Sequence, residues 1–252
     1  MTEKPIDKLL ATIAALRDKD TGCPWDVEQD FQSLAKYTIE EAYEVADAAQ
    51  RNHRDDLVEE LGDLLLQVVF YAQIAKEDGL FSFDEIAERL VQKLVSRHPH
   101  VFGDKEAQSA SDVVHIWEAQ KDKEKAPKES VLDDIPSTLP PLQRAEKLIK
   151  RAGKTGFKFD TTEQARAKFY EELKEFEATP NKDEYGDVLF SFIGWARMAL
   201  AVEEIRSDEA LDHANRKFET RFRETEKLAK TDKPETLDDW TALWAKGKAA
   251  AN

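Results

Sequence analysis

The stretch that decides the fold is Glu40–Tyr71, which reads EEAYEVADAAQRNHRDDLVEELGDLLLQVVFY. It holds two carboxylate pairs, Glu41 with Glu44 and Glu60 with Asp63, in segments whose apolar residues repeat at helical spacing. Residues three apart project from the same helix face. The segment RNHRDD predicts a turn between the pairs, so two antiparallel helices would bring four carboxylates together. Four carboxylates held close together repel one another unless a hard cation binds between them. The stretch therefore predicts a Mg²⁺ site on a helix pair.

Composition narrows the class of protein. The 252 residues suffice for one large domain or two small ones. A net charge of -15 argues against a nucleic acid polymer or an anionic membrane as partner, although a nucleotide remains possible because metal ions invert charge locally. The single cysteine, Cys23, excludes an intramolecular disulfide. The first ten residues, MTEKPIDKLL, do not resemble a signal peptide, and the longest apolar run, 64–72, is too short to cross a bilayer. We therefore expect a cytoplasmic protein.

Glycine and proline are scarce, with nine of each, and β-branched alternation is nearly absent, which predicts an almost wholly helical chain. In the first half we expect helices over 6–17, 33–51, 55–77, 84–97 and 113–123. The segment GCPWD is expected to be a loop, because Pro24 ends any helix, with Trp25 packed in the core. The charged and proline-rich stretch 124–140 predicts a linker between domains at 1–123 and 141–252.

The first half recurs after this linker, which predicts two tandem helical bundles. Gly156–Asp160 (GFKFD) repeats the glycine, aromatic and aspartate offsets of GCPWD. The acidic residues 171, 172 and 175 repeat 40, 41 and 44, residues 184 and 187 repeat 60 and 63, and the basic residues 217 and 221 repeat 93 and 97. Only the turn between the acidic helices differs, being shorter in the second copy and containing Pro180.

An acidic helix face is usually just solvated, but both clusters lie beside apolar residues. Burial of unpaired carboxylates costs several kcal/mol, and a metal would offset that cost. Gly62 and Gly186 each cost about 1 kcal/mol of helix propensity, and we expect them to permit a close approach of two helices. The basic pairs are either surface salt bridges or phosphate contacts. Carboxylates for Mg²⁺ beside cations for oxyanions describe a polyphosphate site.

Several motifs together resemble the MazG nucleoside triphosphate pyrophosphohydrolases of the all-α NTP pyrophosphatase superfamily. They are GCPWD, EEAYE, EELGD, RHPHVF, LDDIP, and EELKE with DEYGD in the second copy. The resemblance runs from about Ile6 to Trp244 and includes both copies. It implies an intertwined homodimer of helical bundles and Mg²⁺-dependent hydrolysis of NTP or dNTP to the monophosphate and pyrophosphate.

The resemblance also implies roles for individual residues. The metal ligands would be Glu41, Glu44, Glu60 and Asp63 in the first copy and Glu172, Glu175, Glu184 and Asp187 in the second. It implies that Lys217 and Arg221 bind the phosphates and that a C-terminal tryptophan stacks on the base, with Trp244 as the candidate and Trp240 as the rival. By position, Lys93 and Arg97 in the first copy and Lys168 and Lys182 beside the second cluster are further phosphate candidates. Glu40 and Glu171 would orient or deprotonate a metal-polarised water that attacks the α-phosphorus.

Other classes of protein fit less well. A di-iron bundle needs Glu-x-x-His on two helices, which the chain lacks. His98 and His100 hint at zinc without further ligands, and Asp55, Asp56 and Glu59 only faintly resemble the aspartate-rich motif of isoprenoid synthases. A non-catalytic helical module that binds nucleotides or a protein partner remains the alternative. Between the copies, the second is expected to be the more active, because KFETR, Trp244 and Lys182 accompany it.

Overall fold

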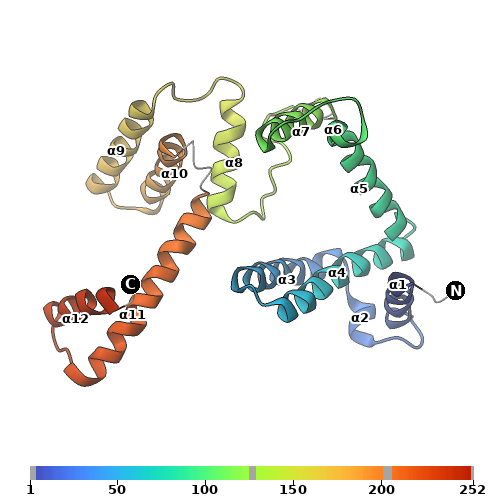
Figure 1. Cartoon of the computed structure of the whole chain (residues 1–252), viewed down its shortest axis with the longest axis horizontal. Helices are drawn as coiled ribbons and strands as arrows, with labels where there is room; N and C mark the ends of the chain where they lie inside the picture. The colour runs from blue at the N-terminus through green and yellow to red at the C-terminus, as the bar shows by residue number, and fades with distance from the viewer. Residues whose placement is uncertain (1–3, 125–128, 201–205, 251–252) are drawn as a thin grey trace. The chain divides into compact units, whose positions relative to one another are not determined.

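The computed structural model describes residues 4–124, 129–200 and 206–250, and over these ranges it contains twelve helices and no strand (Figure 1). The all-helical prediction is thereby confirmed. The chain divides into two compact units, 1–125 and 126–252. No helix in the described ranges is long and apolar enough to cross a membrane.

Over residues 4–124, the first unit contains seven helices. They are α1 (Pro5–Leu16), α2 (Pro24–Glu28), α3 (Phe31–Arg51), α4 (Arg54–Glu77), α5 (Phe83–Arg97), α6 (Pro99–Phe102) and α7 (Ala110–Glu124). Local signals set their ends: the Asp30 side chain accepts from the backbone at the start of α3, Ser82 does the same for α5, and Asn52 ends α3 with a φ of 54°.

The expected GCPWD loop is wrong in part, because α2 begins at Pro24. Proline is well suited to the first helical position, where its missing N–H would have had no partner. Trp25 is 50% exposed, so the core packing expected for it is also wrong. Its ring lies edge-on to Tyr37, with 5.9 Å between ring centroids.

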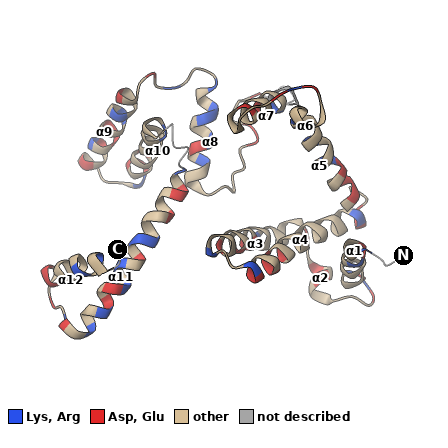
Figure 2. Cartoon of the chain, in the orientation of Figure 1, with Lys and Arg blue, Asp and Glu red and all other residues tan. Residues whose placement is uncertain are grey.

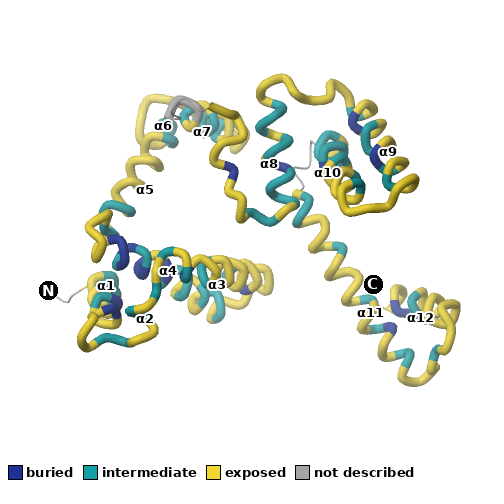
Figure 3. Tube along the Cα trace, turned by 180° about the vertical axis from the view of Figure 1, so that it is seen from behind, coloured by how far each residue is buried: buried dark blue, intermediate teal, exposed yellow. Residues whose placement is uncertain are grey.

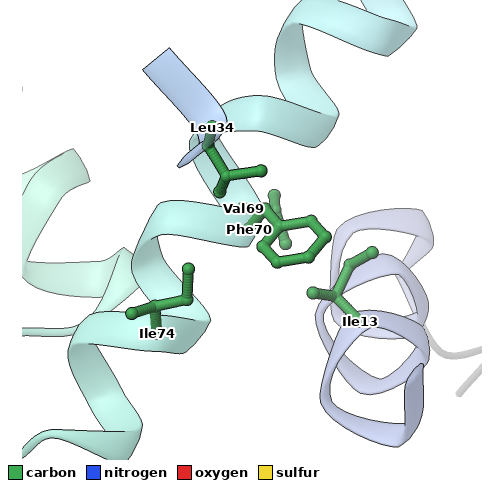
Figure 4. Close-up of a cluster of buried hydrophobic side chains, with 5 residues drawn as sticks. All are labelled: Ile13, Leu34, Val69, Phe70 and Ile74. Atoms are coloured by element: carbon green, nitrogen blue, oxygen red, sulfur yellow. The ribbon is translucent and has the colours of Figure 1, made fainter. Parts of the chain in front are cut away.

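The core of the first unit lies where α1, α3 and α4 meet (Figure 4). Ile13 of α1, Leu34 of α3, and Val69, Phe70 and Ile74 of α4 are buried against one another. Figure 3 shows the same concentration of buried positions along α4. This apolar cluster packs the end of the α3–α4 pair formed by the start of α3 and the second half of α4. The first acidic residues lie further along the pair, toward the connection between the two helices.

Arg17 fastens the loop after α1 to this core. Its Nη2 lies 2.8 Å from Glu77 Oε2, and its Nη1 donates to the carbonyl oxygens of Asp26 and Gln29. The Arg17 side chain is buried, and its loss would leave these partners partly buried without a hydrogen-bond donor. The ion pair therefore joins α1, α2 and α4.

In the described part of the second unit, residues 129–200 and 206–250, there are five helices. They are α8 (Pro141–Gly153), α9 (Thr162–Ala178), α10 (Lys182–Ala199), α11 (Ser207–Asp232) and α12 (Leu237–Ala250). Helix α9 pairs with α10, α8 packs against α10 and α11, and α12 packs against α11. Gly247 allows the last contact, because a Cβ there would lie 3.0 Å from the Arg221 carbonyl oxygen. Part of the predicted linker, 125–128, lies outside the described residues.

Candidate metal centre

The first acidic cluster lies between α3 and α4. Carboxylate oxygens of Glu41, Glu60 and Asp63 all lie within 4.8 Å of one another, and Glu44 is outside this triad. Burial is the first cause of the raised pKa of Glu41, followed by the carboxylates of Asp63, Glu44, Glu60 and Glu40. Burial likewise raises the pKa of Glu60, with Glu44 the next contributor. The neighbours that act on these two groups are all carboxylates, so the cluster is short of positive charge.

The second acidic cluster lies between α9 and α10. Its triad is Glu172, Glu175 and Glu184, again within 4.8 Å, and Asp187 is outside it. Glu172 is buried, and Lys168 Nζ lies 2.7 Å from its Oε1 and 2.8 Å from Glu171 Oε1. Burial and then the Glu172 and Glu184 carboxylates raise the pKa of Glu175, while Lys168 opposes the shift. This cluster therefore carries its own cation.

The two helix pairs differ in length beyond the acids. In the first copy, α3 continues from Glu44 to Arg51 before the connection to α4 at Arg54. In the second, α9 ends at Ala178, soon after Glu175, and α10 begins at Lys182. The expected shortening of the turn is therefore wrong: the connection has three residues rather than two, and each helix has lost about one turn.

The glycines beside the acids do not serve the role expected of them within one chain. A Cβ at Gly62 or at Gly186 would meet nothing within 4 Å. The predicted close approach of two helices is thus wrong for the chain's own helices, and both positions face open space.

The basic candidates lie on other helices. Lys93 and Arg97 are on α5, where the Arg97 guanidinium lies 5.2 Å from the Trp117 ring centroid. Lys217 and Arg221 are on α11, and Lys182 is the exposed first residue of α10.

The aromatic candidates lie on α12. The ring centroids of Trp244 and Phe218 are 5.3 Å apart, and those of Trp240 and Phe222 are 6.4 Å apart. Figures 1 and 2 show that α12, and the part of α11 that it covers, lie away from the α9–α10 pair. Within one chain, the second cluster is therefore joined by Lys168 but not by the α11–α12 candidates.

One polar group beside the first cluster was missed by the sequence reasoning. Gln67 lies one turn after Asp63 on α4, and its buried Oε1 has no hydrogen-bond partner. The only signal is that a polar residue interrupts the apolar run 64–72. An unpaired buried oxygen near an acidic triad is a further donor for a cation or for a water molecule.

The donor sets favour a hard cation. Among the described residues, the groups of three or more potential ligands consist of carboxylates alone. All-oxygen sites suit Mg²⁺, whereas zinc and di-iron sites use histidine or cysteine. His98 Nδ1 lies 2.6 Å from the Leu94 carbonyl oxygen, which is a helix-end contact. The acidic triads therefore fit Mg²⁺ and not the rival metals.

Together, the fold and the two triads define an all-helical protein with a carboxylate metal centre between paired helices. Residues 29–102 match the model of the MazG nucleotide pyrophosphohydrolase domain. Over 234 residues the chain is 47% identical to the nucleoside triphosphate pyrophosphohydrolase of Escherichia coli K12, which covers 88% of both chains. It is 38% identical over 231 residues to the nucleoside triphosphate pyrophosphohydrolase/pyrophosphatase MazG of Thermotoga maritima, covering 90% of this chain and 87% of that one.

The chain therefore belongs to the MazG nucleotide pyrophosphohydrolase family, and the resemblance seen in the motifs is confirmed. A crystal structure of a mazG-related protein from Thermotoga maritima is similar at 28% identity with a TM-score of 0.39, covering 46% of this chain and 98% of that chain.

Proposed function

We propose that this protein is a Mg²⁺-dependent nucleoside triphosphate pyrophosphohydrolase that converts NTP or dNTP to the monophosphate and pyrophosphate. The Escherichia coli relative, which aligns over most of both chains, is a nucleoside triphosphate pyrophosphohydrolase. The observation that carries the proposal is the second triad, in which oxygens of three carboxylates lie within 4.8 Å of one another and Lys168 pairs with one of them, Glu172.

The triads supply the ligands for the metal. Glu41, Glu60 and Asp63 would hold it in the first copy and Glu172, Glu175 and Glu184 in the second, with Glu44 and Asp187 as adjacent acids. When bound, Mg²⁺ neutralises triphosphate oxygens and makes a coordinated water more acidic.

The remaining roles belong to the protein's own side chains. Glu171 in the second copy and Glu40 in the first adjoin the triads and would orient the attacking water or take its proton. The basic candidates described above would pair with phosphate oxygens, Arg221 in a bidentate manner and the lysines as point charges. The Trp244 ring would stack on the base.

We propose further that the working unit is a homodimer of two such chains. On α10, Tyr185 is 55% exposed and Phe192 is 47% exposed, and on α11 Phe218 is 58% exposed. Exposed apolar rings at this density are typical of surfaces that another chain covers. A second chain would also bring a basic and aromatic α11–α12 pair to the acidic cluster, which the chain's own α11–α12 pair does not reach.

The activity is tested by measuring pyrophosphate release from a panel of NTPs and dNTPs with and without Mg²⁺. We expect Mg²⁺-dependent release that Glu172→Gln abolishes. The matched control is Glu177→Gln, which removes an exposed carboxylate from the same helix. Absence of release from every nucleotide would replace the enzyme by a non-catalytic nucleotide-binding or protein-interaction module.

The homodimer is tested by mixing two inactive variants. Chains carrying Glu172→Gln and chains carrying Arg221→Gln, unfolded together and refolded, should regain activity if one site draws on both chains. Light scattering gives the oligomeric state of each sample. Dimers that form without any regain of activity would show that each chain completes its own sites.

A further inference from the structure

The side chain of Lys168 lies at the place where the second cluster would bind a cation. Its Nζ lies 2.7 Å from Oε1 of Glu172, which is also a member of the carboxylate triad. The Glu172 side chain is only 11% exposed, so its oxygens have few other ways to meet a charge. The same ammonium group lies 2.8 Å from Glu171 Oε1, so one lysine pairs with two neighbouring acids.

The first cluster has no such group at the corresponding position. Counting from the acidic residues, the counterpart of Lys168 is Tyr37, which precedes Glu41 by one turn. The Tyr37 ring packs against Trp25, and the ammonium group of Lys36 lies over it at 4.6 Å from the centroid. A neutral ring thus stands in the first copy where an ammonium group stands in the second.

We infer that Lys168 is a built-in counter-ion of the second acidic cluster, which a divalent metal must displace from Glu172 before it binds. This inference rests on the proposed metal centre. Two cations compete for one carboxylate oxygen, so the lysine lowers the intrinsic metal affinity of the second cluster relative to the first.

Once displaced from Glu172, the Lys168 ammonium group is available to bind phosphate. It belongs to a long, flexible side chain one helical turn from the triad, where it meets the phosphates of an incoming nucleotide. Metal and nucleotide then bind the second cluster cooperatively, because the nucleotide offers Lys168 a partner in place of Glu172. The first cluster has no residue that would couple the two ligands in this way at position 37.

The experiment measures binding of Mn²⁺ alone to the full-length chain, by electron paramagnetic resonance of the free ion. To isolate the second cluster, the first is silenced with Glu41→Gln and Glu60→Gln. In that background, Lys168→Met should tighten Mn²⁺ binding by about three- to tenfold, the range for loss of one partly exposed charge pair. Lys174→Met, which removes an exposed lysine from the same helix, should leave the affinity within about twofold.

A reciprocal variant tests the first copy. With the second cluster silenced by Glu172→Gln and Glu175→Gln, Tyr37→Lys should weaken Mn²⁺ binding to the first cluster by a similar factor. Circular dichroism verifies that each variant keeps its helices.

The possible outcomes separate this inference from the proposed function. If the background binds Mn²⁺ and Lys168→Met leaves the affinity unchanged or weaker, or if Lys174→Met tightens it equally, the counter-ion role is overturned while the metal centre stands. If the background with an intact second cluster binds no Mn²⁺ even with Lys168→Met in place, the proposed metal centre itself fails.

Discussion

The two acidic clusters occupy corresponding positions on their helix pairs, yet a different set of three carboxylates converges in each. In the first, one acid from α3 meets two from α4, whereas in the second two from α9 meet one from α10. In the first, burial and then neighbouring carboxylates raise the pKa values of Glu41 and Glu60; in the second, Glu175 also has a raised pKa, but Lys168 opposes that rise and pairs with Glu172. Repetition of acidic positions therefore does not repeat the balance of charge, and the two copies are expected to bind metal differently.

The surroundings of the clusters differ as well. The first unit has a continuous buried cluster of aliphatic and aromatic side chains. In the second, the buried residues include Glu146, Glu172 and Thr225, and the rings of α9 and α10 contact one another while remaining partly exposed. The first unit thus has the larger buried apolar cluster, while large hydrophobic side chains remain exposed in both units.

The largest expected effect is on turnover. Glu172→Gln should lower the rate of pyrophosphate release by about 100-fold or more, since it removes a buried member of the triad, whereas Glu41→Gln should lower it by about tenfold or less. Steady-state assays of both full-length variants give the comparison. The opposite order would make the first cluster the principal site.

Metal removal comes next. Mg²⁺ at about 100 times its dissociation constant should raise the free energy of unfolding of the unit that binds it by about 2.7 kcal/mol. The first unit should gain more than the second at a given Mg²⁺ concentration, because the position that corresponds to Lys168 is the neutral Tyr37 there. Calorimetry with Mg²⁺ and with chelator gives the two transitions. Equal gains in both units would remove this distinction between the clusters.

The ion pair of Arg17 provides a test of the difference in packing. Arg17→Met should lower the free energy of unfolding of the first unit by about 2 to 3 kcal/mol, because it leaves Glu77 partly buried without its partner. The control in the second unit is Arg151→Met, where the arginine donates to the Val131 and Asp133 carbonyl oxygens, and the expected loss is about 1 kcal/mol. Urea unfolding measures both, and similar losses would contradict the contrast.

The same ion pair predicts a dependence on pH. Although burial opposes it, the hydrogen bonds from Arg17 and Gln73 lower the pKa of Glu77 below its ordinary value. A depressed pKa in the folded state contributes stability above the unfolded pKa, and this is lost as the pH falls through the folded pKa. The first unit should therefore lose stability as the pH falls below the ordinary pKa of a glutamate, and Glu77→Gln should remove that part of the dependence. An unchanged acid transition in Glu77→Gln would contradict the assignment.

The smallest expected effect concerns the glycines beside the acids. Gly62→Ala and Gly186→Ala should each raise the free energy of unfolding by about 0.5 to 1 kcal/mol, because alanine favours the helix and its Cβ meets open space. Thermal unfolding at low protein concentration measures the change. Destabilisation at Gly186 alone would indicate that a second chain covers the second unit at that face.

Much of the fold follows from local features that a sequence displays. The helices over 33–51, 55–77 and 84–97 were predicted within a few residues, because caps and apolar spacing define them. The exposure of Trp25 was not predicted, because the tertiary packing around a side chain decides its exposure. The start of α2 at Pro24 was not predicted either, because proline both ends helices and favours their first position.

For the candidate site, the sequence predicted which helices carry the acids, but not which three acids converge or that α11 and α12 lie away from the second cluster. Three-residue spacing on adjacent helices was enough to place the acids together, but the set of three that converges depends on how the helices are rotated about their axes. The pairing of Lys168 with Glu171 and Glu172 had a signal in its spacing of three and four residues. The unpartnered Gln67 oxygen had almost none, because polar residues also interrupt apolar runs at the surface.

The shortened α9–α10 pair has a consequence for how this site tolerates change. Because each helix is shorter by about one full turn, the remaining residues of α9 and α10 keep nearly the same orientation about their helix axes. The end of this helical hairpin can therefore be changed in length without rotating the acidic residues. Its three-residue connection, Thr179–Asn181, is therefore a position where a fluorescent reporter or a grafted recognition loop would sit close to the second cluster and leave the pitch of both helices unchanged.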